Sequence, residues 1–419
     1  MHSRKLIASL IGVVALFTLA PLMSAQSTFQ SLFNFALWDG KWPRTSILDK
    51  AGNLYGTTQA GGTSSEGVIF KLTPNADGSW TRTILHNFTG GSDGQGPFTS
   101  LTFDPAGNLY GTTPFGGASG GYGVVFQLVP NSNGTWTENV LHSFNGTDGY
   151  LPSGGVVFDG AGNLYGATIG GGSPVCGLDF NGCGVVFKLT PNSDGSWSES
   201  TVYAFCSQKG CRDGWEPGSG SLIFDQAGNL YGTTEASCFP GNGIAHGCPG
   251  TVFKLSPNAD GSWTESVLHY FCSWGISSTC KDGVGPVSLI MDQAGNLYGG
   301  ATSLDARMVF ELSPNADGSW SEKVLHYFPG TNNAPQPQNL VFDAAGNLYA
   351  TWPGTAGDGE VFKLSPNASG LWRETVVHTF QISDGEGPDS LVFDSAGHLF
   401  GTTVGGGTNG YGTAFEITP

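Results

Sequence analysis

Charged side chains are scarce in this chain of 419 residues, at 12% of the total, which is about half of the usual share. That scarcity argues against coiled coils and solvated helical bundles, whose surfaces carry many charges. Basic residues are the rarer sign, with 16 Lys and Arg against 33 Asp and Glu and a formal net charge of −17. A generic nucleic-acid-binding protein is therefore excluded, and binding to anionic membranes is disfavoured, because both need a basic surface.

Long apolar runs are also lacking, except for one near the N-terminus. Residues 1–25 have the form of a secretory signal peptide, with Arg4 and Lys5 before an apolar stretch at 6–19 and small residues for cleavage at 23–25. The alternative is a transmembrane anchor, but the run is shorter than the ~20 residues of a comfortable span. We expect export to the periplasm or the medium, with no membrane insertion after cleavage.

The eight cysteines fit the oxidising compartment that export implies. They come as four close pairs, each within one loop, and this spacing predicts the disulfides Cys176–Cys183, Cys206–Cys211, Cys238–Cys248 and Cys272–Cys280. The alternative is a zinc site. It is disfavoured because no CxxC spacing is present and His246 is the only histidine near these cysteines.

Glycine is plentiful, at 67 residues, because a turn-rich segment recurs along the chain. A sequence close to FDxAGNLYGTT occurs seven times, with its aspartate at 49, 104, 159, 225, 292, 343 and 394. Each copy is followed by a segment close to GxVFKL, and six copies continue through PNADGSW into an alternating run such as 80–88. Repeats of this length indicate an architecture built from one supersecondary unit.

Each repeat predicts four short strands, which we call a to d. In the first copy strand a ends at Asp49, and strands b, c and d span 53–58, 68–72 and 80–88. The DxAGN and NADGS turns supply the residues that tight hairpins need for positive φ angles. Such repeats predict an all-β fold, a seven-bladed β-propeller with four antiparallel strands per blade. A β-solenoid is the alternative.

The strand count predicts how the ring closes. The chain stops at Pro419, directly after the seventh strand c, so the last repeat lacks a strand d. Residues 27–35 (STFQSLFNF) match the strand d pattern WTRTILHNF. We expect the N-terminal strand to complete the last blade, which removes both open sheet edges. Residues 26–419 would then form a single propeller domain.

These repeats resemble a known family. FDxAGNLYGTT, GxVFKLTP, LHxF and DGxxP together are similar to the GloVer (Gloeo/Verruco) tandem repeat of exported bacterial proteins, over residues 27–419. The resemblance implies an exported bacterial protein and no particular chemistry. Family members often end in a sorting or anchoring segment, whereas this chain ends at the repeat itself, which does not favour surface anchoring.

The b–c and d–a loops are expected at one end of the strands, which we call the loop face, and the short a–b and c–d turns at the other, the turn face. Variable loops on a rigid scaffold usually carry function. Five tryptophans outside the repeat pattern lie in these loops and are the candidate ligand-binding residues: Trp38, Trp42, Trp215, Trp274 and Trp352. The loops are longest around the third to fifth blades, where we expect the site. The alternative is that these side chains fill small cores beneath the loops.

Histidine and aspartate recur at fixed places in the repeat. Five histidines occupy one position of strand d and are expected to be structural, namely His86, His142, His269, His326 and His378. The d–a loops share a DGxxP motif, which is first a turn device. Its aspartates could instead form a carboxylate ring at the channel mouth that holds Ca²⁺, with Asp93, Asp148, Asp213, Asp282 and Asp384 as candidates. No EF-hand spacing is present, so we predict no cofactor or specific metal site.

A catalytic site has weaker support. The enlarged loops hold Arg212, Asp213, Glu216, Glu235 and His246, which could supply an acid, a base and an orienting cation. No nucleophile elbow, phosphate loop or zinc-binding helix motif is present. We therefore expect a monomeric binding module for a glycan or an extended peptide. A hydrolase or lyase acting at the channel mouth, and a structural scaffold, are the alternatives.

Overall fold

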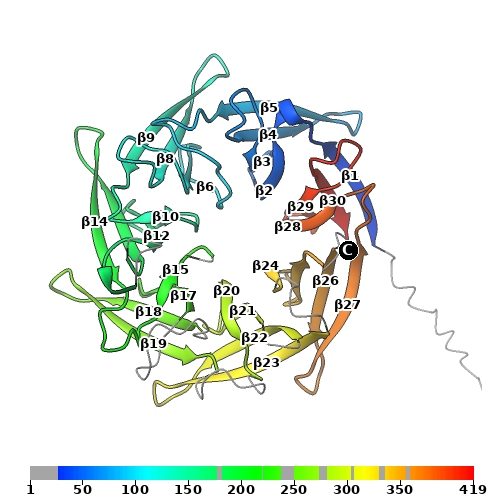
Figure 1. Cartoon of the computed structure of the whole chain (residues 1–419). Coiled ribbons are helices and arrows are strands. Elements are labelled where there is room, and N and C mark those ends of the chain that lie inside the picture. Colours follow the sequence, from blue (N-terminus) through cyan, green and yellow to red (C-terminus); the bar gives the residue numbers. More distant parts are fainter. Residues whose placement is uncertain are drawn as a thin grey trace, which may run out of the picture.

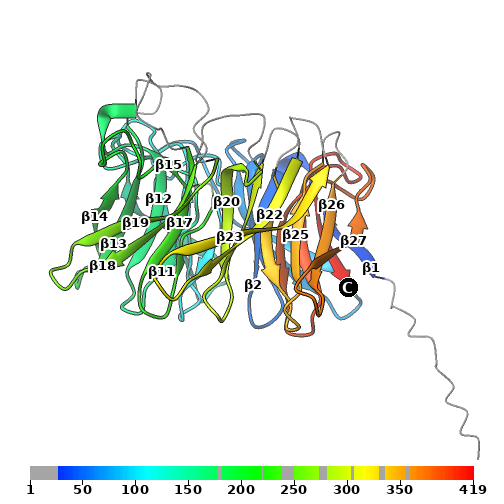
Figure 2. The same cartoon turned by 90° about the horizontal axis from the view of Figure 1, so that it is seen from below.

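The computed structural model describes residues 27–176, 182–218, 220–236, 250–272, 281–302, 306–329, 336–354 and 359–419. These residues form seven antiparallel sheets arranged as blades around a central channel (Figure 1). This is the seven-bladed β-propeller that the repeats predict. Seen from the side, short turns lie at one edge of the ring and long loops at the other (Figure 2). The predicted signal segment, residues 1–25, lies outside the described part.

The first four blades follow the chain order from the channel outwards. Blade 1 contains β2 (Lys41–Leu48), β3 (Leu54–Ala60), β4 (Val68–Pro74) and β5 (Trp80–Asn87). Blade 2 contains β6 (Thr102–Phe103), β7 (Leu109–Thr113), β8 (Val124–Pro130) and β9 (Trp136–Ser143). Blade 3 contains β10 (Tyr150–Pro152), β11 (Val157–Phe158), β12 (Leu164–Gly170), β13 (Val185–Pro191) and β14 (Trp197–Ala204). Blade 4 contains β15 (Trp215–Pro217), β16 (Ile223–Phe224), β17 (Leu230–Ala236), β18 (Thr251–Pro257) and β19 (Trp263–Tyr270).

The remaining blades complete the ring. Blade 5 contains β20 (Val284–Met291), β21 (Leu297–Thr302), β22 (Ala306–Pro314) and β23 (Trp320–Pro329). Blade 6 contains β24 (Gln338–Phe342), β25 (Leu348–Trp352), β26 (Glu360–Pro366) and β27 (Trp372–Thr379). Blade 7 contains β28 (Glu386–Phe393), β29 (Leu399–Gly405), β30 (Thr413–Thr418) and the N-terminal strand β1 (Thr28–Asn34). Two 3₁₀ turns, η1 (Leu37–Asp39) and η2 (Pro174–Cys176), lie in loops.

The ring closes as the strand count predicts. β1 pairs antiparallel with β30, from Thr28 opposite Thr418 to Asn34 opposite Thr413. The two ends of the chain therefore share one sheet, which leaves blade 7 with the same four strands as the others (Figure 1). This pairing covers the sheet edge that a missing outer strand would expose.

The innermost strand differs from the continuous segment that the repeat suggests. In blade 3 it is split into β10 and β11, which both pair with β12. Gly154 and Gly155 lie in the interruption, and a Cβ atom on Gly154 would lie 2.6 Å from the carbonyl oxygen of Gly220 in the next blade. Blade 4 is split in the same way. The channel wall in these blades is therefore irregular backbone in close contact with its neighbour.

The repeat aspartate is a structural residue of the turn face. Asp49 accepts hydrogen bonds from the backbone N–H groups of Ala51 and Asn53, both at 2.9 Å. Its second oxygen accepts from the Asn53 amide at 2.7 Å and the Tyr55 hydroxyl at 3.1 Å. Burial alone would raise the pKa of Asp49, but these donors hold it below its usual value. The motif DxxxNxY recurs in six blades, and in this turn its three polar residues hydrogen-bond to one another, whereas blade 7 has His398 and Phe400 instead.

The core lies between adjacent blades and is built from one repeated contact. Phe70 of strand c is fully buried over Gly56 of strand b, where a Cβ atom would approach the Phe70 ring to 2.5 Å. Glycine holds this position in six blades, and Ala350 holds it opposite Phe362 in blade 6. Tyr55 then meets Trp136 of the next blade edge to face, with ring centroids 6.4 Å apart. Six of the seven blade junctions contain such an aromatic contact.

Candidate functional site

Two of the candidate tryptophans are exposed on the loop face, between blades 7 and 1. The side chain of Trp38, on η1, is 72% exposed, and Trp42, at the start of β2, is 41% exposed. The Lys41 ammonium lies 4.4 Å from the centroid of the Trp42 ring. Leu37 and Ile382 of neighbouring d–a loops are exposed as well. Aromatic surface of this kind is typical of binding sites.

Trp42 also has an unusual backbone. It precedes Pro43 with φ 60°, although a residue before proline normally avoids the left-handed region. Glycine holds the equivalent position in three other blades, at Gly96, Gly285 and Gly387. Leu151 and Glu216 are the other non-glycine residues there, both with φ 54°. Side chains retained at a position that suits glycine suggest a functional role.

The other candidate tryptophans differ from this pair. Trp215 is partly buried against the core cluster of blades 3 and 4, and Trp352 packs in the same way against the core near Phe328. Neither indole N–H has a hydrogen-bond partner within the described residues. These two side chains therefore fill loop cores, as the alternative interpretation holds, and Trp274 lies outside the described residues. Among the candidate tryptophans that the structure describes, the exposed ones are therefore Trp38 and Trp42, at blades 7 and 1.

A polar pocket of about 350 Å³ lies in the central channel. Every blade contributes to it through residues at or near the start of its innermost strand. Hydroxyl and amide side chains predominate, including Thr45, Ser100, Ser153, Ser221, Ser288 and Asn339. Such groups both donate and accept hydrogen bonds. The chemistry of the wall suits an uncharged, hydroxyl-rich ligand.

One ion pair lies in this wall and joins the first and last blades. Arg44 Nη1 lies 3.1 Å from Asp389 Oδ1, and Arg44 Nη2 donates to Gln59 Oε1 at 3.0 Å. Burial raises the pKa of Asp389, and Arg44 opposes that rise. The Arg44 Nε atom is buried and has no partner within the described residues. This pair was not anticipated, because nothing in the sequence relates residues at opposite ends of the chain.

The four catalytic candidates that the structure describes do not form one cluster. Asp213 is fully buried and accepts hydrogen bonds from the Tyr203 hydroxyl at 2.8 Å and the Ser207 backbone N–H at 2.9 Å, so its role is structural. Arg212 is exposed, and His246 lies outside the described residues. Glu235 lines the channel pocket. Burial and, to a lesser extent, Glu235 raise the pKa of Glu216.

The DGxxP aspartates do not form a ring at the channel mouth. Four of them pair with the strand d histidine of their own blade, on the outer strands, at Nε2 to Oδ2 distances between 3.1 and 3.5 Å: Asp93, Asp148, Asp282 and Asp384. The outer strands of the blades lie at the periphery of the ring, away from its central axis (Figure 1). Each aspartate therefore caps its own loop, as expected of a turn device, and the alternative carboxylate ring is not present in the described residues.

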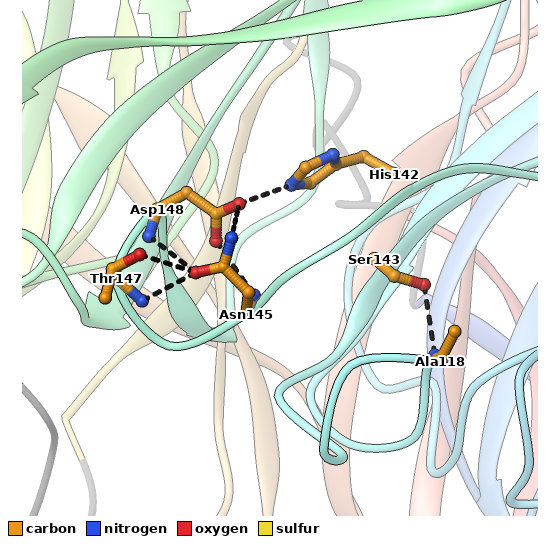
Figure 3. A network of polar contacts seen from close by, with 6 residues as sticks. All are labelled: Ala118, His142, Ser143, Asn145, Thr147 and Asp148. Atoms are coloured by element: carbon orange, nitrogen blue, oxygen red, sulfur yellow. Dashed lines mark hydrogen bonds and ion pairs between the residues drawn. The ribbon is translucent and has the colours of Figure 1, made fainter.

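Figure 3 shows one of these networks. Asp148 accepts from the Asn145 backbone at 2.9 Å, the Asn145 amide at 2.7 Å and His142 Nε2 at 3.1 Å. Asn145 Oδ1 in turn accepts from the N–H and the hydroxyl of Thr147. Burial lowers the pKa of His142. The network orders the d–a loop of blades 2 and 3.

A glutamate from the next blade joins this network. Glu199 brings an oxygen to within 4.8 Å of donor atoms of His142 and Asp148, a set that could hold a divalent metal ion. Burial, together with Asp148, raises the pKa of Glu199 to about 7. The signal that sequence reasoning missed was a glutamate two residues after five of the six strand d tryptophans, at Glu138, Glu199, Glu265, Glu322 and Glu374.

Two of the predicted disulfides are present, Cys176–Cys183 and Cys206–Cys211. Cys176 Sγ lies 3.2 Å from Cys206 Sγ, so the two disulfides are adjacent. Together with Trp215 they tie the b–c loop of blade 3 to the loop that enters blade 4. Cys272 is also disulfide-bonded. Cys238, Cys248 and Cys280 lie outside the described residues.

Comparisons with known proteins identify relatives of the repeat and of the fold. The sequence model of the Gloeobacter/Verrucomicrobia repeat matches residues 15–180 and 81–307. No curated protein matches the chain. In the described residues, no helix is long and apolar enough to cross a membrane.

Among solved structures, a streptogramin B lyase is 13% identical with a TM-score of 0.55, over 94% of this chain and 97% of its own. A catalytically inactive virginiamycin B lyase from Staphylococcus aureus with quinupristin is 15% identical with a TM-score of 0.55, over 94% and 100%. An ulvan lyase, described as a polysaccharide lyase, is 13% identical with a TM-score of 0.54, over 90% and 94%. At these identities the likeness shows the fold alone.

Proposed function

Because the chain belongs to the Gloeobacter/Verrucomicrobia repeat family and its propeller encloses a polar channel pocket, we propose that it is an exported glycan-binding protein. The observation that carries this proposal is the composition of the pocket wall. Hydroxyl and amide side chains from six blades, together with Asp389 of the seventh, surround a space of about 350 Å³, and Arg44 and Asp389 pair with each other. A saccharide matches such a wall, because its hydroxyls donate and accept hydrogen bonds without bringing charge.

The exposed tryptophans support the same ligand class. Trp42 begins the strand that carries Arg44 into the channel, so an aromatic face stands on the loop side of the pocket wall. Sugar rings present C–H faces that pack on such aromatic surfaces. Trp38 extends this surface on the adjoining 3₁₀ turn. A chain of sugars could then contact the tryptophans with one residue and the pocket with another.

The proposal is tested by binding of the purified protein to a panel of plant, algal and bacterial polysaccharides, followed by calorimetry on the best ligand. Ser100→Phe places a bulky ring in the pocket and should abolish binding. Ser196→Phe makes the same change in an exposed turn of the turn face and should leave binding unchanged. If no polysaccharide binds, or if both variants bind as the native protein does, the pocket is not a glycan site.

A hydrolase or lyase is the second candidate. The observation that favours it is the half-buried Glu216, whose pKa is raised and whose neighbour Glu235 lines the pocket. A carboxyl group that keeps its proton nearer to neutral pH can act as a general acid. Prolonged incubation with the bound polysaccharide would show new reducing ends or an unsaturated product. Loss of that product in Glu216→Gln, with binding retained, would establish catalysis.

Export is part of the proposal. The two disulfides in the structure fit an oxidising compartment, and the first 25 residues have the form of a signal peptide. N-terminal sequencing of the protein recovered from the periplasm or the medium tests both points. A first residue of Gln26 is expected. Recovery of the intact chain from the cytoplasm would contradict export.

A further inference from the structure

Six blade junctions contain the same aromatic contact on the turn face. The tryptophan that begins strand d of one blade meets the strand b ring of the preceding blade, at centroid distances between 5.8 and 6.4 Å. At the first junction this indole belongs to Trp136. It packs against Tyr55 and lies in one cluster with Phe103. We call the space that each indole fills an indole slot.

The seventh junction, between blades 6 and 7, lacks its indole. Its outer strand is β1, which comes from the N-terminus and pairs Thr28 with Thr418. The equivalent pair in blade 1 is Thr81 with Thr73, and Trp80 is the residue just before Thr81. In β1 that preceding residue is Ser27, whose hydroxyl donates to the Val377 carbonyl at 2.6 Å. The ring closure therefore leaves one slot with a serine in place of a tryptophan.

A pocket of about 580 Å³ lies at this junction. Its wall includes Tyr349, Phe393 and Pro419, which correspond to Tyr55, Phe103 and Pro130 around the indole of Trp136. Tyr349 and Phe393 keep the edge-to-face geometry of the filled slots, with centroids 5.1 Å apart against 5.2 Å for Tyr55 and Phe103. The walls are thus those of an indole slot, and only the indole is missing.

The polar groups around this pocket fit an aromatic guest. The Lys363 ammonium lies 5.6 Å from the centroid of Tyr349, as Lys71 lies 5.5 Å from that of Tyr55 in a filled slot. His398 replaces the usual asparagine of the turn and lies 3.3 Å from both Asp394 and Glu416. Carboxylates near the rim can accept a hydrogen bond from an indole N–H, which is a donor only.

We propose that this seventh slot is a binding site for a tryptophan side chain presented by an extended polypeptide partner. The six occupied slots show which group the walls accept, because each holds a peptide-borne indole against a strand b ring, a tyrosine in five slots and Phe400 in the sixth. The site lies on the turn face, whereas the proposed glycan pocket lies in the channel. It is therefore independent of the proposed function.

The test uses the full-length chain and N-acetyltryptophanamide as the probe, with N-acetylleucinamide as the non-aromatic comparison, by calorimetry and ligand-observed NMR. We expect one saturable site for the tryptophan probe and at least tenfold weaker binding of the leucine probe. Ser27→Trp supplies the missing indole, so it should weaken probe binding at least tenfold and raise the melting temperature. Ser31→Trp adds an indole at an exposed position of the same strand and should change neither.

A second variant keeps the proposal testable if Ser27→Trp does not fold. Trp136→Ala empties an occupied slot, so it should raise the stoichiometry of probe binding from one to two. The proposal is overturned if the native chain does not bind the tryptophan probe. The slot would then be closed, or it would be filled by residues of the same chain that precede Ser27. Equal binding of both probes, or unchanged binding by Ser27→Trp, would overturn it as well.

Discussion

The ring of Phe29 lies flat against the imidazole of His378, with centroids 4.1 Å apart and planes within 5° of parallel. At five of the six other junctions the position of Phe29 holds a glutamate, such as Glu374, which lies 3.0 Å from His326 of the preceding blade. The N-terminal strand therefore replaces a polar contact with an aromatic stack where it closes the ring. Phe29 also packs near Phe380 and Phe415.

Phe29→Ala should weaken the closure of the ring. The substitution removes the stack on His378 and contacts with two buried rings, and we expect a loss of about 2 kcal/mol, below the range for a fully buried Phe because this one is half-buried. Thermal melts measure the effect. Gln30→Ala, at an exposed position of the same strand, is the control and should melt as the native protein does. Equal melting of the two variants would show that β1 contributes no stability through this side chain.

The exposed and the packed tryptophans should respond in opposite ways. Trp38→Ala and Trp42→Ala should each weaken glycan binding tenfold or more, about 1.4 kcal/mol, because an exposed aromatic contributes to binding and little to folding. The melting temperature should stay unchanged. Calorimetry and melts on the same samples separate the two effects.

Trp215→Ala is the matched comparison. Trp215 packs in a core cluster with both disulfides, so its removal should cost about 2–3 kcal/mol of stability. The sequence pattern predicts instead that Trp215 lies in the loop and binds ligand, so that its removal would weaken binding and leave stability unchanged. If Trp215→Ala loses binding and keeps its melting temperature, the aromatic surface at blades 7 and 1 is not the site.

The adjacent disulfides make a specific prediction for peptide mapping. Proteolysis without reduction should release peptides joined by Cys176–Cys183 and by Cys206–Cys211. Cys176 Sγ is 3.2 Å from Cys206 Sγ, so thiol–disulfide exchange would give a peptide in which Cys176 is bonded to Cys206. If the untreated protein already contains that peptide, the pairs Cys176–Cys183 and Cys206–Cys211 are wrong. Each short loop closure stabilises the fold by roughly 2–3 kcal/mol at most. The pairs Cys238–Cys248 and Cys272–Cys280 are expected in the same map.

Glu199 should make folding stability depend on pH. Its pKa rises from 4.5 to about 7 in the folded protein, so the folded state holds a proton that the unfolded chain releases between these values. The contribution of Glu199 to the free energy of unfolding is therefore fully present below pH 4.5 and is lost as the pH rises through about 7. His142 acts in the opposite direction, because its lowered pKa reduces stability as the pH falls.

A difference measurement isolates the glutamate. Glu199→Gln should melt progressively higher relative to the native protein as the pH is raised from 5 to 8. We expect a change of about 1 kcal/mol, since the carboxyl group is partly exposed and solvent screens it. Ser200→Ala, at the exposed neighbouring position, should show no such trend. A pH-independent difference for Glu199→Gln would show that this carboxyl group does not titrate in that range.

Much of the fold could be predicted because the repeat is local. The turns DxAGN and NADGS contain within a few residues the donors and acceptors that define them, as the bonds of Asn53 and Tyr55 to Asp49 show. The match of residues 27–35 to strand d likewise predicts the closure, because register follows from the alternation of side chains. The site was less predictable. Exposure depends on the neighbours of a side chain, and Trp215 and Trp42 look alike in sequence.

The amino-acid sequence by itself determined the number of blades, the strands within each blade and the way the ring closes, since these follow from short-range patterns repeated seven times. Only the tertiary structure decided which residues meet across blades. The Arg44–Asp389 pair, the group of His142, Asp148 and Glu199, and the slot beside Ser27 each join segments far apart in the chain. Such contacts depend on how the blades pack around the ring, and this packing cannot be predicted from a local sequence pattern.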